Sequence, residues 1–150
     1  MTMRTRIPII ALLLTLTCSC ALMTPSAPYD PAFDAGLVAL RKDVHAFFDE
    51  LAASAGKPDG AYSVFAPEYR TFSDGIAALR GQAVRHARND ATVQSLDLLR
   101  ENFDKVEAMH RDGLLPEEVE ILRPLVDTQL RLLVELERAK RGGSPTREVR

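Results

Sequence analysis

Four segments of the chain repeat apolar side chains at alternating spacings of three and four residues, the spacing that lines them along one side of an α-helix. We expect helices over about 31–55, 71–88, 91–112 and 116–141. No segment alternates polar and apolar residues as a half-buried strand would. Because the connections between the segments are short, the sequence predicts an all-α protein, an up-and-down bundle of about four helices. A pair of helical hairpins that completes its core by dimerising is the alternative architecture.

The apolar stripes define the expected core. They comprise Phe33, Leu37, Leu40, Val44, Phe47 and Leu51 in the first segment, Phe72, Ile76, Leu79, Ala83 and His86 in the second, Leu96, Leu99, Phe103, Val106 and His110 in the third, and Val119, Leu122, Val126, Leu130, Leu133 and Leu136 in the fourth.

Local signals mark the ends of these helices. Thr71 and Asp74 have the spacing of a capping box, and Asp90 or Thr92 can cap the third helix. Gly113 suits the left-handed position that follows a helix. Pro116, with acidic residues behind it, is typical of a first helical turn. We also expect a kink at Pro124 and ion pairs four residues apart, from Asp127 to Arg131 and from Glu137 to Arg141.

The first twenty residues have the pattern of a bacterial lipoprotein signal. Arg4 and Arg6 precede an apolar run from Ile7 to Leu16, which is followed by Cys18 and Cys20. The run is about ten residues long, half of the roughly 20 that a transmembrane helix needs. Cys20 follows a small residue, Ser19, and is favoured over Cys18 as the lipidation site. An ordinary cleaved signal with incidental cysteines is the alternative.

This signal sets the expected domain organisation. It predicts a lipoprotein signal peptide at 1–19, a lipidated, proline-rich tether at 20–31, a helical-bundle domain at 32–141 and a loose C-terminal tail at 142–150. Acyl chains such as palmitate on the cysteine would hold the chain in a membrane. After cleavage the chain has 17 basic and 21 acidic residues, so a nucleic-acid partner is not expected.

Basic residues gather near the C-terminus, where a solvated helix end explains them most simply; contact with anionic headgroups or peptidoglycan carboxylates is the alternative. They are Arg138, Lys140, Arg141, Arg147 and Arg150.

Residues that could carry chemistry are few. His45, His86 and His110 lie in different predicted helices, and none has the spacing of a metal-ligand pair. There is no nucleophile elbow and no phosphate-binding loop. We therefore expect neither an enzyme, a metal site nor a cofactor. The alternative is a small-ligand or metal-binding sensor with a cleft near His86 and His110.

One segment has the composition of a binding surface. Tyr62, Phe65, Tyr69 and Phe72 fall in a predicted loop that leads through a turn at about 66–70 into the second helix. Tyrosine combines an apolar ring with a polar tip and suits an interface. These four residues are the candidate partner-binding site; the alternative, which the sequence favours, is that they close the open end of the bundle.

Several short motifs are similar to those of a group of small, uncharacterised helical lipoproteins of Gram-negative bacteria. They are Tyr29-Asp30-Pro31, Tyr69-x-x-Phe72, Leu96-Asp97-Leu98-Leu99, Leu122-Arg123-Pro124-Leu125 and the ending from Glu135 to Arg141. The resemblance implies a lipoprotein and no activity.

Together these features predict a non-enzymatic, lipid-anchored protein on the periplasmic face of the outer membrane. It would act by binding an unknown envelope protein or, alternatively, a second copy of itself as a homodimer. A periplasmic inhibitor or immunity protein is a further alternative.

Overall fold

The computed structural model describes residues 27–143, and these form four long helices and two short 3₁₀ turns. The helices are α2 (Pro31–Ser54), α3 (Tyr62–Ala83), α4 (Asp90–Asp112) and α5 (Pro116–Ala139), with turns η1 (Pro58–Gly60) and η2 (Lys140–Gly143). The predicted signal, Cys18, Cys20, most of the tether and residues 144–150 lie outside the described part. Within it, no helix combines the length and the apolar character needed to cross a bilayer.

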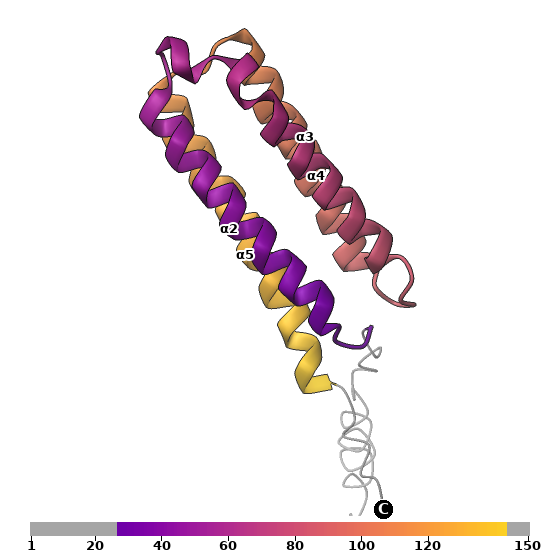
Figure 1. Ribbon diagram of the computed structural model, residues 1–150. Helices are drawn as coiled ribbons and strands as arrows, with labels where there is room; N and C mark the ends of the chain where they lie inside the picture. The colour runs from indigo at the N-terminus through magenta and orange to yellow at the C-terminus, as the bar shows by residue number, and fades with distance from the viewer. Residues whose placement is uncertain (1–26, 144–150) are drawn as a thin grey trace, which may run out of the picture.

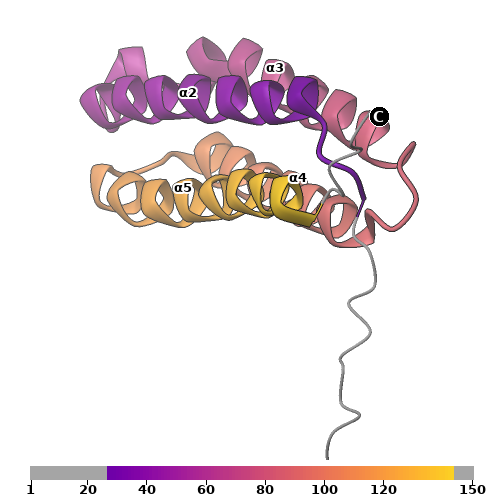
Figure 2. The same ribbon diagram turned by 90° about the horizontal axis from the view of Figure 1, so that it is seen from below.

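The helices pack as an up-and-down bundle, which confirms the predicted fold class. Each helix contacts the next one along the chain, and α5 closes the ring against α2. Figures 1 and 2 show α2 beside α5 and α3 beside α4. The start of α2, the α3–α4 loop and the end of α5 lie at one end of the bundle (Figure 1). We call this the terminal end, and the opposite end, with η1 and the α4–α5 turn, the distal end.

The predicted stripes form the core with few exceptions. Leu37, Leu51, Leu96, Leu99 and Leu130 are completely buried. Among the described residues, the core cluster runs from Phe33 to Val134 and draws on all four helices. Because one core closes among four helices of a single chain, a second copy is not needed to complete it.

Several predicted helix ends are confirmed. Asp30 accepts hydrogen bonds from the backbone of Ala32 and Phe33 at the start of α2. Pro116 occupies the first turn of α5, where the Glu118 carboxylate accepts the Leu115 N–H. Gly113 has the predicted positive φ, +100°.

The start of α3 was predicted wrongly. The helix begins at Tyr62, nine residues before the expected start, and Thr71 lies inside it, with its hydroxyl bonded to the Pro67 carbonyl rather than in a capping box. A proline inside a helix removes one backbone hydrogen bond. Burial of the aromatic residues, whose spacing continues the stripe of Ile76, outweighs that loss.

The connection between α3 and α4 also differs from the prediction. The helix ends at Ala83 rather than near Arg88, so His86 lies in a loop. Neither Asp90 nor Thr92 caps α4; Asn89 occupies the cap position.

Candidate functional site

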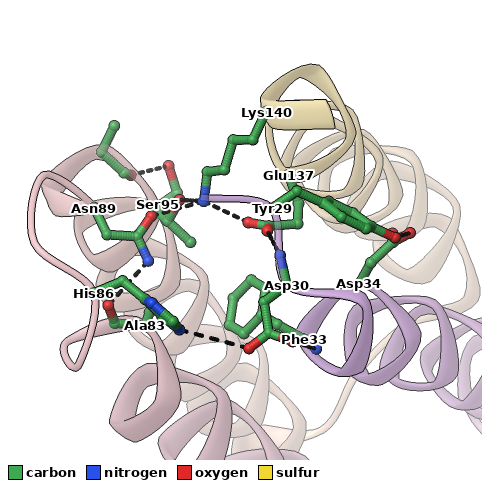
Figure 3. A network of polar contacts seen from close by, with 12 residues as sticks. Tyr29, Asp30, Phe33, Asp34, Ala83, His86, Asn89, Ser95, Glu137 and Lys140 are labelled. Carbon is green, nitrogen blue, oxygen red and sulfur yellow. Dashed lines mark hydrogen bonds and ion pairs between the residues drawn. The ribbon is translucent and has the colours of Figure 1, made fainter. Parts of the chain in front are cut away.

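A buried polar network joins three elements at the terminal end of the bundle (Figure 3). Lys140 is 6% exposed, and its Nζ donates to Glu137 Oε2, to Asn89 Oδ1 at 2.7 Å and to Thr92 Oγ1 at 3.2 Å. Asn89 donates in turn to the Ala83 carbonyl at 2.9 Å. The expected solvated helix end is thus wrong for Lys140, because its ammonium group is held inside the protein and donates to three side chains.

The segment just before α2 is bound to the same network. The Asp30 N–H donates to Glu137 Oε1 at 3.0 Å, and the Ala27 N–H donates to the Arg88 carbonyl at 3.3 Å. Residues 27–30, expected to be part of the proline-rich tether, are therefore attached to both α5 and the α3–α4 loop. This attachment fixes the place where the chain enters the bundle.

Asp30 also lies beside His86, whose Nε2 is 3.6 Å from Asp30 Oδ2 (Figure 3). The pKa of Asp30 lies below its usual value, chiefly because its carboxylate accepts the Phe33 N–H; burial opposes this shift, and Ala32 and His86 add to it. The ionised carboxylate is therefore the form that the folded state prefers.

This preference predicts a pH effect that depends on Asp30. A carboxylate with a lowered folded-state pKa stabilises the fold above its unfolded pKa, and that contribution is lost as the pH falls through the folded pKa. We expect Asp30→Asn, which keeps a capping side chain, to lose less stability than the wild type between about pH 5 and pH 2. Urea unfolding across this range measures it. Equal pH profiles for the two proteins would contradict the assigned role of Asp30.

A second ionic cluster lies beside the network, on the outer side of α2 and α5. Asp34 is buried, and its carboxylate accepts from the Tyr29 hydroxyl at 2.8 Å, from Arg141 at 3.0 Å and from Arg138 at 3.3 Å. The Arg141 guanidinium lies 4.3 Å from the centre of the Tyr29 ring. The expected pair of Glu137 with Arg141 is wrong, because each residue has a different partner.

A groove runs between α2 and α5 in the half of the bundle nearer the terminal end. It has a volume of about 250 Å³ and is lined by Val38, Arg41, Lys42, His45, Val134 and Arg138. Asp127 accepts from both Arg41 at 2.8 Å and His45 at 2.7 Å, so its expected pairing with Arg131 is also wrong. These contacts lower the pKa of Asp127, the hydrogen bond from Arg41 most strongly.

Large apolar side chains are exposed on the outer side of α5 and at its border with α4. Ile121, Leu125 and Leu132 are 63%, 63% and 53% exposed, and their spacing of four and seven places them on one face of α5. Asn102 of α4 donates to Gln129 of α5 at 3.0 Å, which marks the side of α4 that faces α5.

Leu98 precedes Asn102 by one helical turn, lies on that same side of α4, and is 52% exposed. We call Leu98, Ile121, Leu125 and Leu132 the outer apolar patch. Sequence reasoning missed it because the same leucine-rich stretch supplies the core, and only the phase of the helix separates the two sets.

The aromatic residues predicted to bind a partner are instead in α3 and face the core. Phe65, Tyr69 and Phe72 are 5%, 3% and 4% exposed, and Tyr62 is partly buried. The loop expected there does not exist, so these side chains present little surface to a partner. The rings pack around Phe47, which agrees with the favoured interpretation that they close one end of the bundle.

His110 belongs to this aromatic cluster. Its Nε2 lies 2.8 Å from the Gly60 carbonyl, which can only accept, so Nε2 carries hydrogen; Nδ1 lies 3.1 Å from the Tyr69 hydroxyl. Burial raises the pKa of Tyr69, with a smaller contribution from Glu107, and this keeps its hydroxyl protonated as a donor. His110 thus joins α4, α3 and η1 through two buried hydrogen bonds.

The three histidines do not meet. His86 precedes α4 and His110 lies in its last turn, so the 23-residue helix, about 35 Å long at 1.5 Å per residue, separates them. The cleft postulated between these two residues is therefore wrong. Within residues 27–143, no group of three or more His, Cys, Asp or Glu side chains is arranged to hold a metal ion.

Comparison with known proteins adds no relative: no protein-family model, curated protein or solved structure matches this chain. The resemblance to small lipoproteins rests on the sequence motifs alone and stays a prediction.

Proposed function

We propose that this chain is a non-enzymatic, lipid-anchored protein of the periplasmic face of the outer membrane that binds another envelope protein through the outer apolar patch. The observation that carries the proposal is the exposure of Leu98, Ile121, Leu125 and Leu132 on one side of a bundle whose described helices already share one core. Large apolar side chains exposed on one face of a domain mark a candidate interaction surface.

The proposed anchor agrees with the geometry of the terminal end. Cys20 precedes Ala27 by seven residues, a span of at most about 25 Å for an extended chain. An acylated Cys20 would thus hold the terminal end near the bilayer and leave the sides of the bundle accessible to a partner. Intact-mass spectrometry tests the anchor, which an unmodified Met1 terminus would contradict.

Charge favours a different protein over a second copy as the partner. The distal half of the bundle, residues 43–72 and 102–127, carries 12 acidic and 5 basic side chains, a net charge of −7. Two copies anchored side by side in one membrane would bring these acidic halves together, which costs free energy. The partner that fits best has an apolar surface bordered by basic residues where it meets Ile121 and Leu125, the two patch residues of the acidic half.

Site-specific photo-crosslinking in cells tests this surface. With the cross-linker at Leu125, we expect one product heavier than the protomer but not twice its mass, and Leu132→Glu should abolish it. The matched control is a cross-linker at Val84, which is 53% exposed on the α3–α4 connection and outside the patch. A product of twice the protomer mass, or the same product from both positions, would overturn the proposal. Leu132→Glu should leave stability within about 0.5 kcal/mol of the wild type, since its side chain is exposed.

A further inference from the structure

The two ends of the bundle differ in charge. In contrast to the distal half, residues 27–42, 73–101 and 128–143 carry 8 acidic and 10 basic side chains, a net charge of +2. The asymmetry follows the long axis of the bundle, because each of the four helices contributes one half to each end (Figure 1). A molecule of this kind has a preferred orientation next to a charged surface.

Ion pairs inside the terminal end neutralise three of its eight acidic groups. Asp34 is buried against Arg138 and Arg141, Glu137 is buried against Lys140, and Asp30 has its contact with His86. The carboxylates of Asp30, Asp34 and Glu137 are thus each held by a basic side chain of the protein.

Arg85 and Arg88, in the α3–α4 loop, are exposed and form no ion pair with a carboxylate of the described residues. Arg85 donates only to the Gly81 carbonyl, at 3.1 Å. Arg88 has a positive φ of +64°, and its carbonyl accepts the Ala27 N–H, so this loop is fixed directly beside the point where the chain enters the bundle. The two unpaired guanidinium groups therefore lie at the end that the tether reaches.

We propose that the terminal end is a docking surface for an anionic phospholipid membrane, with Arg85 and Arg88 against the headgroups and the acidic distal end directed away from the bilayer. The inference extends the proposed function, since the acyl anchor at Cys20 would supply the proximity. The 24-residue helices are about 36 Å long, several times the Debye length of about 8 Å at physiological salt. The negative distal end therefore does not cancel the attraction at the terminal end.

Vesicle binding of residues 21–150, without acyl groups, tests the surface separately from the anchor. This chain retains every described core residue, and a thermal melt checks that it is folded. We expect binding to vesicles of phosphatidylcholine mixed with phosphatidylglycerol, little binding to phosphatidylcholine alone, and release by high salt. Arg85→Gln with Arg88→Gln should weaken binding roughly 25-fold, because each basic residue near an anionic surface contributes about fivefold.

The matched control removes two exposed cations from the distal half. Arg70→Gln with Lys105→Gln changes the net charge equally and should weaken binding less than twofold. Equal losses from both pairs, equal binding to both vesicle types, or no binding to either would overturn the docking surface. Those results would leave the anchor intact, because the tested protein has none. An unmodified Met1 terminus, in contrast, would remove the anchor without altering the vesicle result.

Discussion

Replacing Lys140 by methionine is expected to lower the free energy of unfolding by about 3–5 kcal/mol, the cost of leaving one partner of a buried ion pair uncompensated. Lys140 is 6% exposed and Glu137 is 1% exposed, so water cannot take the place of the missing ammonium group. The substitution also removes the ammonium group that donates hydrogen bonds to Asn89 Oδ1 and Thr92 Oγ1, and both of these residues are buried. Urea unfolding followed by circular dichroism measures the loss.

Two further variants separate the buried charge from other effects of the substitution. Lys140→Met combined with Glu137→Gln should recover part of the loss, because the neutral amide still accepts the Asp30 N–H and leaves no buried charge. Arg131→Met breaks an exposed pair with Glu135, in which the side chains are 46% and 58% exposed. It should cost less than about 0.5 kcal/mol. A loss no larger for Lys140→Met than for Arg131→Met would show that the network contributes little.

The overall architecture could be predicted because it depends on periodicity, which is a local property of the sequence. The bounds of α4 were within one residue of the prediction, and its stripe of Leu96, Leu99 and Phe103 is buried. The start of α3 could not be predicted in the same way. Pro67 and the neighbouring turn residues weigh locally against a helix, whereas the contacts that favour it come from Phe47 on α2.

The polar network was missed because its partners are far apart in the sequence. Asn89 and Lys140 are separated by 51 residues, and Asp30 and Glu137 by 107. One signal was present in the sequence. Glu137 continues the apolar stripe of Leu130 and Leu133, and this spacing predicts that its carboxylate is buried. A buried carboxylate requires a cation, but the sequence alone did not identify which of the C-terminal basic residues supplies it.

Phe47→Ala is the second substitution with a large expected effect, a loss of about 3–5 kcal/mol in the free energy of unfolding. Phe47 is 3% exposed, and its ring centre lies between 5.1 and 5.6 Å from those of Phe48, Phe65, Tyr69 and Phe72, all edge to face. Edge-to-face ring pairs stabilise a fold beyond the burial of their apolar area. The substitution therefore removes both the buried area and the ring–ring interactions. Thermal unfolding and the near-ultraviolet circular dichroism signal measure the loss.

An exposed apolar residue on the outer face of α5 serves as the control for the buried Phe47. Leu125→Ala removes a side chain that is 63% exposed, and it should change stability by less than about 0.5 kcal/mol. If Phe47→Ala lowered the free energy of unfolding as little as Leu125→Ala, packing of the aromatic rings would not stabilise the core. The rings would then again be candidates for the binding surface. A large loss for Phe47→Ala and none for Leu125→Ala would instead assign packing to the aromatic cluster. The outer apolar patch would then be the apolar surface available for recognition.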